Sequence, residues 1–272
     1  MSKKLLESHY EGLLERGVRI IGLAGDKGSG KDSTANFIAG INLVTHNFIN
    51  EFHSTNGGQI EIDGRIKPIN EIAPRYIKIY HFADYLKEIV YNLFNIDYED
   101  LMYNKGAVTK YNWRDMPGVI TDKNLYNTVM KFLERKGDLA DTVYELPLIY
   151  HADGLMKVRD LLQYVGTEIF RKINSECFTN HLLHKIRVDG VKMAIIADAR
   201  FINELDAIKK AGGLNFKLTR GNNTDSHSSE NDFKNYDQWD AIIDNSECND
   251  IRCLNKVVYE SVVDLGVFEV IG

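Results

Sequence analysis

Hydrophobic and polar positions follow two patterns along this chain, continuous apolar runs and apolar residues at helical spacing. Short continuous apolar runs are typical of strands that are covered on both faces of a sheet. Apolar residues three and four positions apart indicate helices with one buried face. The continuous runs predict strands at 18–24, 76–82, 191–197, 214–218 and 241–243.

Helical spacing occurs mainly between these runs. It predicts helices at 4–16, from Lys31 toward Gly40 or a little beyond, from Ala83, near Val129–Arg135, from Lys157, at 203–211 and after the last strand. Strands that alternate with helices are typical of an α/β fold with a doubly wound, mainly parallel sheet. We therefore expect this fold class.

Two segments depart from the alternation. Turn residues at Asn56-Gly57-Gly58 and Asp63-Gly64 flank short alternating stretches, so residues 55–67 are expected to form an inserted hairpin. Residues 103–125 lack clear periodicity, and we expect a mobile loop there that acts as a lid over a site. Beyond it, a short extended piece at 143–150 is expected after the helix near Val129–Arg135.

Composition narrows the class of protein. The chain has 272 residues and 44% hydrophobic content, which is enough for a sizeable core, so we expect a single domain, 1–272, with insertions at about 41–75 and 103–152. A formal charge of −6 without a dense basic segment argues against a nucleic-acid-binding surface. No run reaches membrane-spanning length and no signal peptide is evident, so a cytoplasmic protein is expected.

The three cysteines form neither an even set nor a closely spaced pair of the C-x-x-C type. Cys177, Cys248 and Cys253 therefore argue against a disulfide framework or a zinc site. A reducing compartment fits this cysteine usage.

A glycine-rich stretch links the first predicted strand to the next helix. It reads Gly25-Asp26-Lys27-Gly28-Ser29-Gly30-Lys31-Asp32-Ser33. In such a loop, backbone N–H groups converge on phosphate oxygens while the helix points its positive end at them. Lys31 adds a positive charge for the β and γ phosphates. The loop predicts a nucleoside triphosphate site, with a flexible glycine-rich turn as the alternative.

One position of this loop departs from the usual motif. Asp32 stands where a serine or threonine hydroxyl usually binds Mg²⁺, and the hydroxyl moves to Ser33. A carboxylate is a suitable ligand for Mg²⁺, which takes one or two carboxylates and keeps much of its water shell. We expect Asp32 to hold the metal, directly or through water, and Ser33 to contact the α phosphate.

Polar residues follow several of the other predicted strands. In an open α/β sheet the ligand lies beyond the carboxyl ends of the strands, so these residues are site candidates. They are Asp84 with Lys87, Asp198 with Arg200, and Arg220. Asp198 could bind magnesium or cap the following helix, and each arginine could bind phosphate through its forked donors or form a surface ion pair.

The helix that begins near Lys157 carries a further polar group. Arg159 and Gln163 are four residues apart and Thr167 follows one turn later, so the three are expected on one helix face. An arginine, an amide and a hydroxyl there could bind a base or sugar, although a solvated face is the alternative. Gly166-Thr167-Glu168 is expected to interrupt this helix.

Five motifs in the same order resemble those of the deoxynucleoside monophosphate kinases of tailed bacteriophages. They are Gly28-Ser29-Gly30-Lys31-Asp32-Ser33, Phe82-Ala83-Asp84-Tyr85-Leu86-Lys87, the stretch from Arg159 to Glu168, the stretch from Asp198 to Glu204, and His227-Ser228-Ser229-Glu230. The resemblance runs from about Val18 to the C-terminus, apart from the two insertions. It makes Asp32 a matching feature instead of an anomaly.

The resemblance implies an enzyme with a P-loop nucleoside monophosphate kinase-like fold, often a homodimer. It implies transfer of the γ phosphate of ATP to a deoxynucleoside 5′-monophosphate with Mg²⁺, in the cytoplasm of the host cell if the chain is phage-encoded. The ATP and metal residues would be Gly28, Ser29, Gly30, Lys31, Asp32, Ser33 and Arg220, with Asp198 as a second metal ligand. The acceptor residues would be Asp84, Lys87, Arg159, Gln163, Gly166, Thr167, Arg171, Phe178, Asp198, Arg200 and Glu204.

Within these sets Lys31, Arg159, Asp198 and Arg200 are the candidate catalytic groups. Phe178 stands where the family tends to place a tryptophan, a change that stacking could survive. Two other functions stay open. One is a P-loop kinase for another small acceptor such as dephospho-coenzyme A, and the other is a nucleotide-binding module without catalysis.

Overall fold

The computed structural model describes residues 10–136, 148–220 and 232–269. The chain divides into two compact units, which are Met1–Phe82 with Thr179–Gly272 (unit 1) and Ala83–Phe178 (unit 2). Each unit is treated by itself below. The expectation of one kinase domain over 1–272 stays a prediction.

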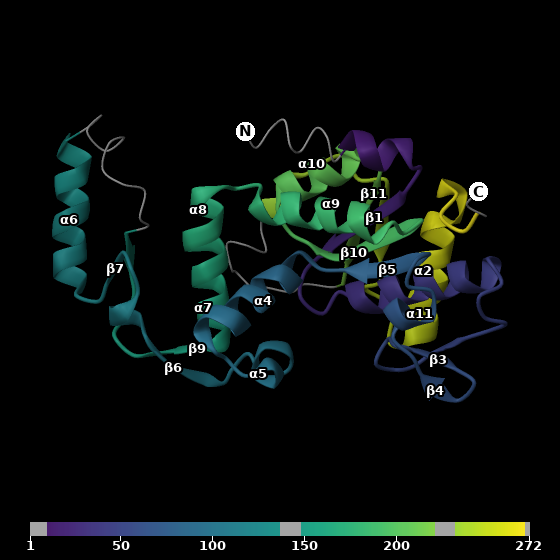
Figure 1. The fold of residues 1–272 in the computed structure, drawn as a ribbon, viewed down its shortest axis with the longest axis horizontal. Helices are drawn as coiled ribbons and strands as arrows, with labels where there is room; N and C mark the ends of the chain where they lie inside the picture. Colours follow the sequence, from purple (N-terminus) through teal and green to yellow (C-terminus); the bar gives the residue numbers. More distant parts are fainter. Residues whose placement is uncertain (1–9, 137–147, 221–231, 270–272) are drawn as a thin grey trace. The chain divides into compact units, whose positions relative to one another are not determined.

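Unit 1 contains a five-stranded parallel sheet, which Figure 1 shows. The strands lie in the order β12 (Ala241–Asp244), β11 (Leu214–Thr219), β1 (Arg19–Gly25), β10 (Met193–Ala199) and β5 (Ile77–Tyr80). All four neighbouring pairs are parallel. The predicted α/β fold with a mainly parallel sheet is confirmed, and all five predicted strands are present.

Helices cover this sheet on both faces. α2 (Lys31–Thr45) and α11 (Ile251–Val262) pack on one face, where Ile21, Leu23 and Ile195 join Ile38 in a buried core. α9 (Cys177–Asp189) and α10 (Ile202–Lys210) lie toward the other face in Figure 1. Strands buried on both faces explain the continuous apolar runs of the sequence.

The predicted inserted hairpin is confirmed, with one further strand. β2 (His53–Ser54), β3 (Ile60–Ile62) and β4 (Arg65–Ile66) form a small antiparallel sheet, and α3 (Ile69–Ile72) follows. Ile60 and Ile62 are buried in the same core as Ile38 of α2. The insertion is therefore anchored to the helix that follows the glycine-rich loop.

Unit 2 has its own core around Val90, Leu101, Trp113, Met156 and Leu161. Its elements are α4 (Phe82–Phe94, with Phe82 in unit 1), α5 (Tyr98–Met102), β6 (Val108–Asn112), η1 (Trp113–Asp115), β7 (Val119–Ile120), α6 (Lys123–Lys136), β8 (Ile149–Tyr150), β9 (Leu155–Lys157), α7 (Val158–Gln163), η3 (Tyr164–Phe170) and α8 (Arg171–Ile173). In the described parts of the chain, no helix is long and apolar enough to cross a membrane.

The segment 103–125, expected to be a mobile loop, contains regular secondary structure, so the expectation of a loop is wrong. This segment contains β6, which pairs with β9, and Trp113, which is buried and stacks on His151 with ring centroids 3.8 Å apart. The partner strand lies more than forty residues further along the chain, so local periodicity carries no trace of the pairing. The lid function of the segment stays a prediction.

The expectation against a disulfide is also wrong. Cys248 and Cys253 are joined, with their Cα atoms 5.3 Å apart. The five-residue separation spans the turn before α11, whose N-cap Asp250 accepts a hydrogen bond from the backbone N–H of Cys253 at 2.8 Å. The spacing of the two cysteines matches no common disulfide or metal motif. Their side chains meet only because the chain turns before α11.

Reduction of this disulfide is expected to lower the stability of unit 1. Closing so short a loop contributes about 2 kcal/mol through the unfolded chain. Thermal melting with and without dithiothreitol tests this, since the reductant should lower Tm by several degrees. A Cys248→Ser/Cys253→Ser variant should melt at the Tm of the reduced wild-type protein, both with and without dithiothreitol. A thiol titration confirms that the disulfide of wild type is reduced. If the Tm of this reduced protein is unchanged, the expectation is contradicted.

Candidate active site

The carboxyl ends of the strands in unit 1 meet at one edge of the sheet. The register pairs Ala24 of β1 with Ala199 of β10 and Gly25 of β1 with Leu218 of β11. It also pairs Ile196 of β10 with Tyr80 of β5 and Thr219 of β11 with Asp244 of β12. The glycine-rich loop and Arg220 follow strands that end side by side, and Asp198 lies in the last two residues of the strand between β1 and β5, with Arg200 directly after it.

The glycine-rich loop runs from Gly25 to the start of α2. Gly25, Gly28 and Gly30 have φ values of 152°, 78° and 90°, in the region that favours glycine. Gly30 is the N-cap of α2 and supplies no side-chain cap. The first N–H groups of a helix have no partner within the helix, so this end of α2 is suited to an anion.

Two cationic side chains lie at the loop. Lys31 donates from Nζ to the carbonyl oxygens of Gly25 at 2.7 Å and Asp26 at 2.8 Å. Arg220 donates to the carbonyl oxygen of Gly28 at 3.3 Å, although it lies 192 residues away in sequence. The structure thus brings Arg220 to the predicted phosphate loop, and its positive charge adds to that of Lys31.

A residue that the sequence analysis missed supports the loop from behind. Asn245, 2% exposed, follows β12 and donates from Nδ2 to the carbonyl oxygen of Ser29 at 2.8 Å. A Cβ on Gly30 would lie 3.0 Å from Leu254 of α11 and 3.4 Å from this amide. Ser29 is itself 1% exposed, and its Oγ lies 3.5 Å from Nζ of Lys31. The only sequence signal for Asn245 was its position after a strand.

Asp32 lies in the first turn of α2 with its side chain 80% exposed. Its Oδ1 is 3.3 Å from Nε2 of His81, which follows β5 and was not among the predicted site residues. Asp198 accepts a hydrogen bond from the backbone N–H of Phe82 at 2.6 Å. The two predicted metal ligands thus both contact the two-residue segment where β5 passes into α4.

Glu204 holds the backbone beside Arg200. It is 1% exposed, and its Oε2 accepts hydrogen bonds from the N–H groups of Arg200 at 2.9 Å and Phe201 at 3.2 Å. This bonding starts α10, so Glu204 performs the capping that was the alternative role for Asp198. The side chain of Arg200 is exposed at the same edge. Direct contact between Glu204 and a substrate stays a prediction.

The carboxylates fit a magnesium ion. Asp32 and Asp198 supply hard oxygen ligands next to the phosphate loop, and Mg²⁺ bound to a nucleotide needs one or two carboxylates besides phosphate and water. In the described ranges no group of three or more His, Cys, Asp or Glu residues is placed to hold a metal.

Unit 2 holds the other predicted residues. In α4, Lys87 pairs with Asp84 at 3.0 Å, and the lysine side chain is 15% exposed. Arg159 and Gln163 are exposed on α7, one turn apart. The backbone N–H of Arg159 donates to the carbonyl oxygen of Lys105 at 2.9 Å, which fixes the start of this helix.

The expected interruption at Gly166-Thr167-Glu168 is wrong, because the helix continues as the π-helix η3. Gly166 is buried, and a Cβ there would lie 2.7 Å from Leu86 of α4. Glycine therefore permits close packing of two helices, while the wider π turns move Thr167 from the regular spacing of Arg159 and Gln163. Burial, followed by the charge of Glu168, raises the pKa of Tyr164 at the start of η3.

Arg171 and Phe178 form a pair at the end of unit 2. The guanidinium carbon of Arg171 is 5.0 Å from the ring centroid of Phe178, a cation–π arrangement, and the ring is 4% exposed. Nearby, burial raises the pKa of the Cys177 thiol. The predicted stacking of a substrate on Phe178 stays a prediction.

The His227–Glu230 motif lies outside the described residues.

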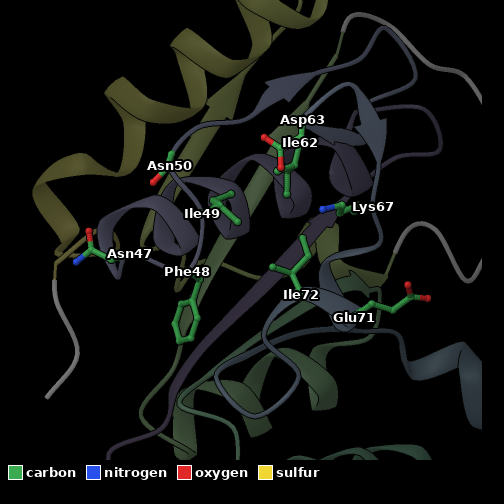
Figure 2. Close-up of a pocket in the computed structure, with 9 residues that line it drawn as sticks. All are labelled: Asn47, Phe48, Ile49, Asn50, Ile62, Asp63, Lys67, Glu71 and Ile72. Carbon is green, nitrogen blue, oxygen red and sulfur yellow. The ribbon is translucent and has the colours of Figure 1, made fainter.

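A surface depression of about 460 Å³ in unit 1 includes none of the predicted site residues. Figure 2 shows it between residues 47–50, after the last turn of α2, and the side chains of Ile62, Asp63, Lys67, Glu71 and Ile72. The phosphate loop precedes the opposite end of the fifteen-residue helix α2, which is about 22 Å long. The depression is therefore distinct from the predicted site.

Comparison with known proteins bears on what this site does. The sequence model of a family described as "Deoxynucleotide monophosphate kinase" matches residues 19–256. A relative from Acanthamoeba polyphaga mimivirus, named "Putative deoxynucleotide monophosphate kinase", is 31% identical over 103 residues, which cover 33% of this chain and 53% of the relative. The match spans about half the length of that curated relative.

Proposed function

Because the chain belongs to the deoxynucleotide monophosphate kinase family, we propose that it transfers the γ phosphate of ATP to a deoxynucleoside 5′-monophosphate, giving the diphosphate. The observation that carries the proposal is the arrangement at the sheet edge of unit 1. There the glycine-rich loop, the ammonium of Lys31 and the guanidinium of Arg220 lie together. This combination suits the triphosphate of a donor.

Positioning and electrostatic stabilisation supply most of the catalysis in phosphoryl transfer. The backbone of Gly28 to Lys31 would hold the donor phosphates, and Lys31 would leave the carbonyls of Gly25 and Asp26 to reach the β and γ phosphates. Arg200 and Arg220 would neutralise charge that spreads over the transferred group. The acceptor phosphate is already anionic, so the reaction needs no strong general base.

Magnesium would be held by Asp32 and Asp198 together with phosphate oxygens, and it would neutralise charge on the β and γ phosphates. His81 contacts Asp32 and the Phe82 backbone contacts Asp198. These two bonds keep the carboxylates in place at the sheet edge.

The family resemblance assigns acceptor residues in each unit, and each set is described by itself. In unit 2, Lys87, Arg159 and Arg171 are cations for the single phosphate of the acceptor, and Gln163 and Thr167 are polar groups for its base or sugar. Asp84, which pairs with Lys87, would orient that lysine. In unit 1 the resemblance assigns Asp198 near the end of β10, Arg200 after the strand and Glu204 in the first turn of α10.

Three finer parts belong to the proposal. The formal charge of −6 favours a free nucleotide over a nucleic acid as the substrate, and the family resemblance favours a homodimer that acts in the cytoplasm. Sedimentation velocity tests the homodimer directly, since a dimer and a monomer of 31.0 kDa differ twofold in mass.

A panel of deoxynucleoside monophosphates assayed with ATP and Mg²⁺ tests the proposed function. Formation of a diphosphate from dTMP, dGMP or dCMP is the expected result. Activity confined to dephospho-coenzyme A or another non-nucleotide acceptor would contradict it. Absence of turnover with every acceptor would favour the nucleotide-binding module.

Arg200→Ala and Arg159→Ala are each expected to lower kcat by about a hundredfold or more while ATP affinity stays near that of wild type. Both side chains are exposed, and the proposal places them at the transferred phosphate and the acceptor. Steady-state kinetics and calorimetry with an ATP analogue measure the two quantities. Arg65→Ala, an exposed arginine of β4, is the matched control and should leave both unchanged. Full activity of either site variant would remove that arginine from the proposed mechanism.

A further inference from the structure

The turn at the tip of the inserted hairpin lies against the first turn of the phosphate-loop helix. Gly58 is buried with a φ of 74°, and a Cβ there would lie 1.9 Å from Oγ and 2.9 Å from Cα of Ser33. The backbone of the turn therefore covers one side of Ser33. Only glycine permits this approach, because any side chain would overlap α2.

Hydrogen bonds and packing hold the turn in this position. The N–H of Gly58 donates to the carbonyl oxygen of Thr55, and the N–H of Thr55 donates to the carbonyl oxygen of Gln59, both at 2.8 Å. Ser54 accepts a hydrogen bond from Nδ2 of Asn255 in α11 at 2.8 Å. Below the turn, a Cβ on Gly40 of α2 would lie 2.6 Å from the ring of Phe52. The hairpin is thus fixed to both helices on this face of the sheet.

The position of the turn relates it to the donor nucleotide. The N-terminus of α2 is the proposed phosphate site, and Ser33 is the third residue of this helix. In the proposed binding mode Lys31 reaches the β and γ phosphates and Ser33 contacts the α phosphate, so the nucleoside of the donor lies on the side of Ser33. The outer residues of the turn, Asn56 and Gly57, are exposed there.

The chemistry of the turn suits a nucleoside more than a phosphate. Residues 54–60 read Ser-Thr-Asn-Gly-Gly-Gln-Ile and carry no charged side chain. The Thr55 hydroxyl already accepts a hydrogen bond from the N–H of Gln59 at 3.2 Å. Asn56 remains as an exposed amide that can donate and accept hydrogen bonds with a sugar or base edge.

We propose that the turn Thr55–Gly58 forms one wall of the donor-nucleotide site and that Asn56 contacts the nucleoside of the donor. The inference rests on the proposed function and deepens it. It gives the inserted hairpin a role in the selection of the donor nucleotide. It also makes Gly58 a positioning residue for Ser33 and the start of α2.

Calorimetry with two magnesium complexes tests the inference, one of a non-hydrolysable ATP analogue and one of inorganic tripolyphosphate, which lacks a nucleoside. Asn56→Ala is expected to weaken the ATP analogue about five- to tenfold and to leave tripolyphosphate unchanged. Asn50→Ala, an exposed asparagine after α2, is the control and should bind both as wild type does. Equal affinity of Asn56→Ala and wild type, or equal losses for both probes, would overturn the nucleoside contact.

Gly58→Ala is expected to weaken both probes about tenfold or more, because the added methyl group displaces Ser33 and the helix start. Gly64→Ala is the matched control, since Gly64 lies in the other turn of the same insertion with a φ of 72°, and a methyl group there would meet no described atom within 4 Å. It introduces the same backbone strain without the overlap and should bind normally. Equal binding by the two variants would overturn the positioning role. If Gly58→Ala does not fold, the surface variant Asn56→Ala still decides the nucleoside contact.

The outcome for wild type separates this inference from the proposed function. If wild type binds neither probe, the proposed ATP site itself is wrong. If wild type binds both and turns over a deoxynucleoside monophosphate while all four variants bind alike, the kinase proposal stands and only the role of the hairpin is rejected.

Discussion

Replacement of Lys31 by alanine is expected to lower kcat for phosphoryl transfer by about a hundred- to a thousandfold. The ammonium belongs to the first turn of α2 and lies against the carbonyls of the phosphate loop. Its loss removes a charge that the proposed transition state needs more than the ground state does. A coupled assay for ADP under saturating substrates measures the effect.

Lys27→Ala is the matched control for this result. Lys27 is an exposed lysine in the same loop, so its removal changes the net charge equally without removing the cation at the helix start. We expect a loss of less than tenfold. Comparable activity of Lys31→Ala and Lys27→Ala, at equal Tm, would contradict the assignment of Lys31.

Gly25→Ala is expected to disrupt the phosphate loop and to lower ATP affinity by about a hundredfold. Gly25 has a φ of 152°, and a Cβ there would lie 2.5 Å from the carbonyl oxygen of Leu218 and 2.7 Å from Oγ of Ser29. The first of these atoms belongs to the backbone of β11, so relief requires movement of the sheet edge or the loop. The unfolding free energy should fall by about 2 kcal/mol or more.

Gly17→Ala separates overlap from backbone strain. Gly17 precedes β1 with a φ of 60°, and a methyl group there would meet no atom of the described residues within 4 Å. Its variant should lose about 1 kcal/mol of stability and keep its affinity for ATP. Chemical denaturation and calorimetry compare the two. If Gly25→Ala matches Gly17→Ala in both measurements, the close approach at Gly25 does not shape the loop.

The parallel sheet was predictable because its strands are buried on both faces. The run Met193–Ala197 is apolar throughout, and the structure buries all five of these residues. The same reasoning located the loop, since a glycine-rich stretch between such a strand and a helix has few other structural uses. The end of β10 was likewise recognisable from Asp198 and Arg200 directly after the apolar run.

Three other features were not predictable in this way. The pairing of β6 with β9 orders a segment that looks irregular by itself, and the π-helix at Tyr164–Phe170 continues a helix through a glycine. The disulfide between Cys248 and Cys253 depends on a turn before α11. In each case the stabilising contact is made with residues outside the segment, and the hydrophobic periodicity of the segment does not describe it.

The residues that support the site show the same division. His81 and Asn245 contact Asp32 and Ser29, but nothing in their own neighbourhoods distinguishes them from ordinary polar residues at strand ends. Glu204 was expected at the acceptor from the resemblance alone, and only the structure shows that its buried carboxylate also holds the backbone of Arg200 and Phe201. The type of a side chain suggests which role it can have, but only its hydrogen-bond partners in the structure show which role it has.

By itself, the order of residues determined the elements, the parallel sheet and the phosphate loop, because burial pattern and backbone freedom are local properties of a segment. Tertiary structure alone decided that Arg220 reaches Gly28, that Asn245 supports Ser29, and that the hairpin turn covers Ser33. These contacts join residues that are far apart in the chain. They form only when strand register and helix packing bring the segments together. The hydrophobic periodicity of a single segment predicts neither the register nor the packing.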